Sequence, residues 1–277
     1  MTVPYPTMQL KQLERYLELL DVPRRKPGLD ALQELVQAHL CRIPFENISK
    51  LYYQSQLGLQ GLPGFDLYLD GVEQFNFGGT CYSNNNFFYQ LLANLGYQAI
   101  LCGADMSNPD VHLVSLVELE GRQYLVDVGY AAPFTAPLPR DLAADHVVIL
   151  GRDRYLLRSQ DTAGCSRLEM YRDGKLKHGY VVKPTPRVIG DFEQVIAASY
   201  RSEASFMNSV LLARFCPRHA LVLSNLTLSE TRGNSTTLRQ LTDRDELPAV
   251  IAECFGIPVK FSQEAVSRVG QFEDVWD

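Results

Sequence analysis

The period of the hydrophobic pattern changes near residue 97, and this change limits the fold to one with separate helical and strand regions. Before it, apolar residues recur at helical spacing over 8–21, 29–40 and 80–96. After it come short strand-like runs at 111–119, 123–128, 146–150, 154–158, 167–171 and 178–183. A helical first third followed by a meander or small barrel of strands predicts an α+β protein.

The rest of the chain is less regular. The Gln- and Gly-rich stretch 54–66 indicates a loop. Pro184, Pro186 and Gly190 mark a boundary after the strand-rich region. Beyond it, the pattern favours helices over 191–199, 203–215 and 245–255, with a strand at 220–228.

Charge and cysteine content exclude several classes of protein. With 277 residues we expect two or three packed subdomains. A net charge of −6 argues against a nucleic-acid partner, because basic patches supply most of that affinity. The six cysteines include no CxxC pair, so we expect no disulfide scaffold and no structural metal site, but reduced thiols in the cytoplasm. The segment Met1–Pro6 lacks a signal-peptide pattern, and no apolar run reaches the ~20 residues of a membrane span.

One cysteine lies where a helix begins. Cys81 follows Gly78-Gly79-Thr80, and Thr80 is suited to cap the predicted helix. The partial positive charge and free N–H groups at a helix N-terminus favour a thiolate and could hold an oxyanion. By position alone, a small buried hydrophobe is an equally good interpretation of Cys81.

A predicted hairpin favours the nucleophile. If Glu120 and Gly121 form a two-residue turn, Asp127 lies opposite Val114, and His112 lies two residues further along on the same face. Such diagonal neighbours are roughly 7–8 Å apart, within reach of side chains. A histidine base and a carboxylate that orients it are what a cysteine nucleophile requires.

No other histidine is placed in this way. We expect the remaining four to be capping or surface residues: His39, His146, His178 and His219. The sequence therefore predicts Cys81 as nucleophile, His112 as base and Asp127 as the acid that orients the imidazole. We expect Cys81 to carry an acyl group taken from a thioester and to pass it to an amine-type acceptor.

These residues belong to several short motifs, and the order of the motifs along the chain matches that of one known family. The chain resembles the arylamine N-acetyltransferases over nearly its whole length. The resemblance rests on Ile43-Pro44-Phe45-Glu46-Asn47, Gly78-Gly79-Thr80-Cys81 with Asn85, Leu95-Gly96-Tyr97, His112, and Tyr124-Leu125-Val126-Asp127-Val128-Gly129-Tyr130.

The resemblance implies a fold with a cysteine-protease-like core: a helical domain over 1–96 with the cysteine, a β-barrel domain over 97–188 with the histidine and aspartate, and an α/β lid over 189–277. It implies acetyl-CoA or another acyl thioester as co-substrate, no tightly bound cofactor, and a small aromatic amine, hydrazine or hydroxylamine as acceptor. Candidate residues for the acyl donor are Thr80, Gly129, Tyr130 and Ala131, and Asn85 is expected to support the site by hydrogen bonds.

Three positions depart from the family pattern. Phe77 stands where the family usually has an Arg that pairs with the residue aligned with Glu46. We therefore expect Glu46 to be exposed, protonated or paired with other groups. Ser83 replaces a usual Glu or Gln, and Ala131 replaces a usual Gly.

These departures leave two further functions open. An amide synthase that takes its acyl group from a carrier-protein thioester is one alternative to transfer from acetyl-CoA. A catalytically silent binding protein on the same fold is the other, and an intact Cys–His–Asp set argues against it.

Overall fold

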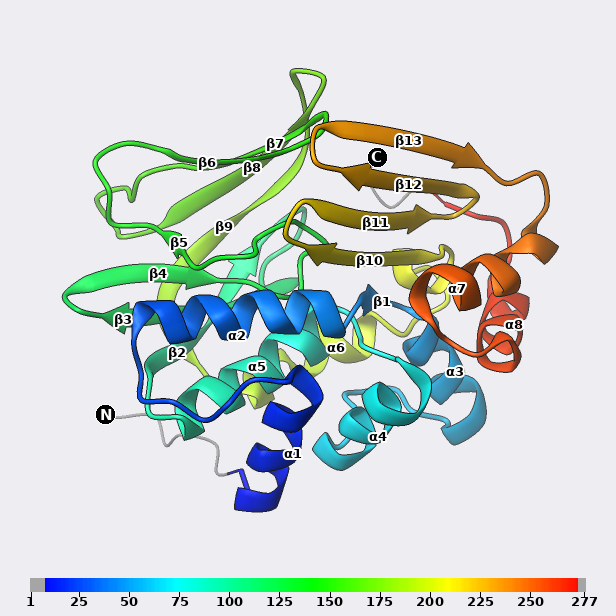
Figure 1. Cartoon of the computed structure of the whole chain (residues 1–277), viewed down its shortest axis with the longest axis horizontal. Coiled ribbons are helices and arrows are strands. Elements are labelled where there is room, and N and C mark those ends of the chain that lie inside the picture. The colour runs from blue at the N-terminus through cyan, green and yellow to red at the C-terminus, as the bar shows by residue number, and fades with distance from the viewer. Residues whose placement is uncertain (1–7, 274–277) are drawn as a thin grey trace.

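The computed structural model describes residues 8–273 and contains two antiparallel sheets with helices packed around them (Figure 1). The segment Met1–Pro6, in which we found no signal-peptide pattern, lies outside the described residues. No helix of the described part has the length and apolar character needed to cross a bilayer. The expected α+β class is confirmed.

Five helices form the first part of the fold. They are α1 (Leu10–Leu20), α2 (Leu29–Arg42), α3 (Ile48–Leu57), α4 (Phe65–Phe75) and α5 (Cys81–Asn94). The three helices predicted from apolar spacing are α1, α2 and α5. The predicted loop at 54–66 is too long, because α3 and α4 occupy both of its ends. Gly58 ends α3 with a φ of 64°, a conformation that glycine adopts without strain.

The middle of the chain forms an eight-stranded sheet that curls into a nearly closed barrel. Its strands, in spatial order, are β5 (Leu138–Pro139), β4 (Arg122–Val126), β3 (His112–Leu119), β2 (Gln98–Asp105), β9 (Lys175–Arg187), β8 (Ser166–Arg172), β7 (Asp153–Leu157) and β6 (His146–Leu150). The hairpin β3–β4 has the predicted register, since Ser115 pairs with Val126 and Leu119 with Arg122. Both turn residues, Glu120 and Gly121, have positive φ, as a two-residue hairpin turn requires.

A second sheet joins the two ends of the chain. Its order is β1 (Phe45–Glu46), β10 (Leu211–Cys216), β11 (His219–Ser224), β12 (Thr227–Arg232) and β13 (Ser235–Gln240). The last third of the described chain also contains η1 (Ile189–Phe192), α6 (Glu193–Ala198), η2 (Ser205–Met207), η3 (Arg244–Glu246), α7 (Leu247–Phe255) and α8 (Val259–Arg268). The helix predicted over 203–215 is wrong, because β10 occupies much of it. The run Val210–Ala213 is buried throughout, and such a run has no period that separates strand from helix.

The structure corrects two expectations, one about a histidine and one about the cysteines. His39 is not a surface residue but lies fully buried in α2, where its Nδ1 is 3.0 Å from the Tyr16 hydroxyl. Cys41 in α2 and Cys216 in β10 form a disulfide, with Cα atoms 4.8 Å apart. The expectation that all six thiols are reduced is therefore wrong for this pair. The other four cysteines are free.

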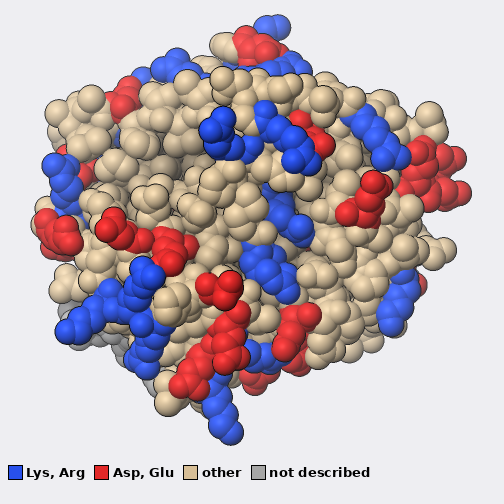
Figure 2. All heavy atoms as spheres, in the orientation of Figure 1, with Lys and Arg blue, Asp and Glu red and all other residues tan. Residues whose placement is uncertain are grey.

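Figure 2 shows acidic and basic side chains of the described residues interspersed over one face of the molecule. Many of the arginines pair with nearby carboxylates, as Arg15 does with Asp70 and Arg187 with Asp110. Neighbouring charges of opposite sign cancel at a distance, so this face has no strong single-sign field.

Candidate active site

Cys81 is the first residue of α5 and is almost completely buried. The two glycines before it allow tight packing. A Cβ on Gly78 would lie 1.9 Å from the Pro44 carbonyl oxygen, and one on Gly79 would lie 2.7 Å from the Ser83 Cβ. Thr80 holds the N-cap position, and its carbonyl accepts hydrogen bonds from the Ser83 and Asn84 amides. The first amides of a helix have no intrahelical acceptor, so those beside Cys81 can bind a negative oxygen.

The hairpin brings His112 and Asp127 together at its open end. The Nε2 of His112 lies 2.8 Å from an Asp127 carboxylate oxygen, and both side chains are buried. Their hydrogen bond is direct, closer than the diagonal spacing expected from the predicted hairpin. Asp127 follows the last residue of β4, where the chain leaves the ladder and can turn its carboxylate toward the imidazole.

Two further side chains hold Asp127. The Asn85 amide donates to Asp127 Oδ1 at 2.8 Å and to the Leu113 carbonyl at 2.7 Å, while its oxygen accepts from the Val128 amide. The Tyr180 hydroxyl on β9 donates to Asp127 Oδ2 at 2.7 Å. Asn85 therefore makes the supporting hydrogen bonds expected of it. Tyr180 was not predicted, because only the pairing of β9 beside β2 brings it to the site.

The electrostatics of the pair favour a charged imidazole. Burial alone would lower the pKa of His112, but the charge and hydrogen bond of Asp127, together with contributions from Cys81, raise it to about 10. Burial opposes the ionised form of Asp127 as well, yet His112, Asn85 and Tyr180 lower its pKa below the ordinary value. A cysteine beside an imidazole that readily takes a proton can act as a thiolate.

A cavity of about 550 Å³ opens in front of these residues. It is lined by Cys81 and His112, and also by Thr80, Gly129 and Tyr130, three of the four residues predicted to contact an acyl donor. The Gly129 amide donates to Asp127 Oδ1 at 3.0 Å. The Lys50 side chain lines the same cavity and was not predicted, since no local sequence signal distinguishes it from a surface lysine of α3.

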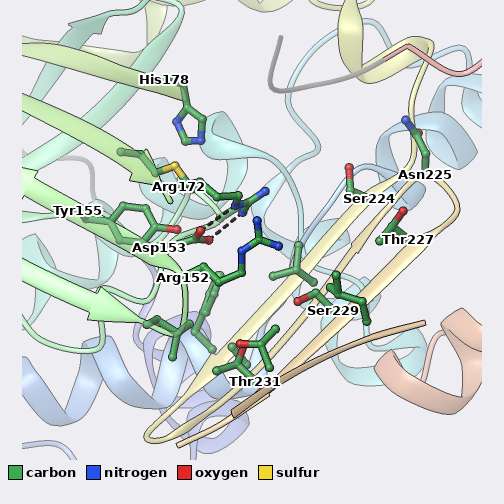
Figure 3. A pocket seen from close by; sticks show the side chains of 18 of the residues that line it. Arg152, Asp153, Tyr155, Arg172, His178, Ser224, Asn225, Thr227, Ser229 and Thr231 are labelled. Carbon is green, nitrogen blue, oxygen red and sulfur yellow. Dashed lines mark hydrogen bonds and ion pairs between the residues drawn. The ribbon is translucent and has the colours of Figure 1, made fainter. Parts of the chain in front are cut away.

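A second cavity of about 560 Å³ lies between the barrel and the C-terminal sheet (Figure 3). Arg152, Asp153 and Arg172 line it from the barrel, and Ser224, Thr227, Ser229 and Thr231 from the other sheet. Arg172 donates two hydrogen bonds of 2.7 Å to Asp153, so its charge is already paired. None of the three triad residues lines this cavity. Ala131, the fourth predicted donor residue, lines it instead of the cavity at Cys81.

A hydrogen bond between the two cavities joins the Tyr130 hydroxyl to His178. Tyr130 lines the cavity at Cys81, whereas His178 lines the second one. The Tyr130 ring centroid is also 5.4 Å from that of His112. This aromatic wall therefore separates the second cavity from the triad.

Glu46 is completely buried and has neutral partners in place of the usual Arg. Its carboxylate accepts from the Gly78 amide at 3.0 Å and from both the amide and the hydroxyl of Ser49. Burial raises the pKa of Glu46, although these hydrogen bonds act in the opposite direction. The expectation that Glu46 finds other partners is confirmed, and exposure is excluded.

Phe77 fills the space of the usual Arg with an aromatic contact. Its ring lies 5.7 Å from that of Tyr53 and 5.4 Å from that of Phe261 in α8. Phe77 therefore packs the segment before Cys81 against the C-terminal helix, at the position where the resemblance implies an ion pair. Ser83, the second departure, is buried one turn after Thr80.

A thiol at the start of a helix, beside a buried His–Asp pair, is the arrangement of enzymes that use a cysteine nucleophile. Residues 28–264 match the model of the N-acetyltransferase family, so the chain belongs to that family. The resemblance seen in the sequence motifs and the expected enzyme class, an N-acyltransferase, are thereby confirmed.

Individual relatives are distant. The chain is 24% identical to arylamine N-acetyltransferase 1 of Homo sapiens, with 90% of this chain and 94% of that protein covered. It is 31% identical to proansamycin X synthase of Amycolatopsis mediterranei over 40% of this chain and 45% of that one. Its fold matches the arylamine N-acetyltransferase of Mycobacterium marinum in complex with CoA, with a TM-score of 0.76, 23% identity, and 93% and 100% of the two chains covered.

Proposed function

We propose that this chain transfers an acyl group from a CoA thioester to an amine, hydrazine or hydroxylamine through a covalent thioester on Cys81. The observation that carries the proposal is the buried set of Cys81, His112 and Asp127 at the wall of a cavity of about 550 Å³. The relative solved with CoA and the arylamine N-acetyltransferases support this donor and this class of acceptor.

The first half of the cycle loads the enzyme. His112 takes the proton of the Cys81 thiol, and Asp127 stabilises the imidazolium that forms. The thiolate attacks the thioester carbonyl, and amides at the start of α5 hold the oxyanion. The carbon–sulfur bond to CoA breaks, and the CoA thiolate leaves with the proton of His112. Cys81 then carries the acyl group.

The second half transfers the acyl group to the acceptor. The amine nitrogen attacks the Cys81 thioester while His112 removes a proton from that nitrogen. The new carbon–nitrogen bond forms as the bond to Cys81 breaks, and the proton returns to the Cys81 sulfur. Because the two substrates react in turn, the kinetics are expected to be ping-pong.

The test is a loading screen read by intact mass. The enzyme is mixed with a series of acyl-CoA thioesters without acceptor and quenched at short times. We expect one acyl group per chain in the wild type and in a Cys254→Ser control, and none in Cys81→Ser. Absence of an adduct from every thioester in the series would refute the proposal.

A second candidate function is amide formation from a thioester on a carrier protein. It is supported by the 31% identity to proansamycin X synthase and by the departures at Phe77 and Ser83. Acyl-pantetheine thioesters and an acylated carrier protein should then load Cys81 faster than the matching acyl-CoA. Faster loading from acyl-CoA would favour the first candidate.

A further inference from the structure

A buried lysine without a carboxylate partner among the described residues lies in the wall of the catalytic cavity. Lys50 in α3 is only 7% exposed. Its ammonium donates to the Ser199 carbonyl at 2.7 Å and to the Ser199 hydroxyl at 2.8 Å, and it lies 4.2 Å from the centre of the Tyr200 ring. Among the described residues, no Asp or Glu forms an ion pair with it.

Burial of an unpaired charge is costly, so the position of Lys50 calls for an explanation. Burial lowers the pKa of Lys50 to about 8, and the charge of Cys81 acts in the opposite direction. Glu46 lies one turn earlier in sequence, but its carboxylate is occupied by Ser49 and Gly78. Both hydrogen-bond acceptors of the ammonium among the described residues are neutral oxygens of Ser199, so one of its three N–H groups is left for a further acceptor.

Once Cys81 carries an acyl group and is no longer a thiolate, the charge balance of the cavity lining is positive. Lys50 lines it together with Cys81 and His112, and no acidic side chain of the described residues is part of its lining. The charge of His112 is already balanced by Asp127. The ammonium of Lys50 is thus the cation of this lining that lacks a compensating carboxylate. The hydroxyl of Ser205 stands in the same wall and can donate or accept a hydrogen bond, whereas that of Ser199 already donates to the Ile196 carbonyl and accepts from Lys50.

We propose that Lys50 binds a carboxylate of the substrate beside Cys81, an inference that rests on the proposed acyl transfer. The carboxylate can belong to the acyl group, as in a dicarboxylic monothioester, or to the acceptor, as in an aromatic amino acid or aminobenzoate. The phosphates of CoA do not fit this position, because the pantetheine arm keeps them far from the thiol that reacts with Cys81.

The first experiment measures the local charge without acyl chemistry. Iodoacetate and iodoacetamide alkylate the same thiolate, but only iodoacetate carries a carboxylate. The rates are followed on the Cys81 peptide by mass spectrometry in the wild type, Lys50→Met and Lys50→Arg. The matched control is Lys11→Met, because Lys11 is an exposed residue of α1. We expect the iodoacetate-to-iodoacetamide ratio to fall about tenfold in Lys50→Met only, since one nearby charge is removed. An unchanged ratio would overturn the proposal.

The second experiment identifies the source of the carboxylate. The ratio of kcat/KM values is measured for malonyl against acetyl thioesters, and for 4-aminobenzoate against aniline. Loss of a charge-assisted hydrogen bond predicts that one of the two ratios falls about 30-fold in Lys50→Met and recovers in Lys50→Arg. The ratio that falls names the substrate that carries the carboxylate. If neither falls while acyl transfer proceeds, Lys50 only links α3 to Ser199, and the proposal is wrong.

Failure of the proposed function and failure of the carboxylate proposal can be told apart. If no thioester loads Cys81, the proposed function fails, but the alkylation ratio still decides whether Lys50 attracts an anion to this thiol. A melting curve of each variant shows whether it is folded. A Lys50→Met variant that melts earlier but keeps the wild-type alkylation ratio would identify Lys50 as a structural link and count against carboxylate binding.

Discussion

Residue 131 lies in the left-handed backbone region, with a φ of 58°, yet it is an alanine. The family pattern has a glycine at this position, and glycine adopts such a conformation without the clash of a Cβ. The departure seen in the sequence is therefore a strained turn residue directly after the segment Asp127–Tyr130, and its side chain contributes to the second cavity and not to the cavity at Cys81.

Ala131→Gly should raise the free energy of unfolding. Relief of the left-handed conformation gives about 1–2 kcal/mol, and the larger entropy of an unfolded glycine removes part of it, so the net gain is about 0.5–1 kcal/mol. Urea unfolding measures it. The control is Ala132→Gly, because Ala132 is buried and has no positive φ. This second variant should be less stable than the wild type, and equal losses in both variants would contradict the strain at residue 131.

His39 makes stability depend on pH. Burial lowers the pKa of His39 to about 3, whereas an unfolded histidine titrates near 6.5. Below about 6.5 the unfolded chain therefore binds a proton that the folded chain does not bind. The contribution of His39 is fully present above that pH and is lost as the pH falls toward 3, by about 1.4 kcal/mol per pH unit.

A His39→Gln variant tests this dependence. It removes the titrating group but keeps a polar side chain beside Tyr16, so it can be less stable at neutral pH. We expect the difference in unfolding free energy between pH 7.5 and pH 5 to shrink by about 2 kcal/mol relative to the wild type. Urea titrations at both pH values give this difference. Equal pH slopes for the two proteins would show that His39 is accessible to protons in the folded state.

At the scale of elements, one close approach positions the triad. A Cβ on Gly129 would lie 2.8 Å from both the Asn85 amide nitrogen and the Cys81 Cα. The segment after β4 can therefore touch the start of α5 only because residue 129 has no side chain. This contact sets the distance from Cys81, on a helix, to His112 and Asp127, on a hairpin.

Gly129→Ala should separate the nucleophile from its base. Displacement of reacting groups by about 1 Å can reduce a rate about 100-fold, and we expect kcat/KM to fall by that factor or more. Gly270→Ala is the control, because a Cβ there meets nothing within 4 Å. Steady-state kinetics with an acyl thioester and an aromatic amine measure both variants. Activity of Gly129→Ala within threefold of wild type would contradict this role.

The parts of the site that depend on local sequence could be predicted. The turn Glu120–Gly121 fixes the register of its hairpin, so the placement of His112 near Asp127 followed from counting residues. The start of α5 at Cys81 followed from its cap and apolar stripe. Asn85 was predicted only through the resemblance, because nothing local shows which carboxylate its amide reaches.

The parts that depend on distant pairing could not be predicted. Tyr180 reaches Asp127 because β9 pairs with β2, a register with a bulge that no short pattern encodes. Lys50 reaches the cavity because Ser199, far along the chain, lies against α3. The pattern of β10 does not distinguish a strand from a helix, because its buried residues are apolar on both faces.

At the scale of the whole molecule, the motif around Phe45 ties the first part of the chain to the last. Strand β1 pairs with β10, and Asn47 donates to the carbonyls of Phe206 and Ser209 and accepts from the Leu211 amide. The division into domains at 1–96, 97–188 and 189–277 stays a proposal. The shared sheet indicates that the outer two parts fold against each other.

The disulfide between Cys41 and Cys216 adds a covalent tie between the same two parts. It predicts four reactive thiols, and not six, when the oxidised protein is unfolded in the absence of reductant. A thiol titration in denaturant measures this number, with the Cys41→Ser variant as a control that should give five. Six thiols in protein kept from reductant throughout would contradict the pairing.

The central claim is that Cys81 carries the acyl group during turnover, and peptide mapping of a quenched reaction tests it most directly. The enzyme is mixed with an acyl thioester, acid-quenched, digested and analysed by mass spectrometry, and a parallel sample receives an aromatic amine before the quench. We predict one acyl group on the peptide that contains Cys81, lost when the amine is added, with the acylated amine formed in equal amount. Amide product formed at the normal rate by a Cys81→Ser enzyme, or an acyl group found on another residue, would contradict the claim.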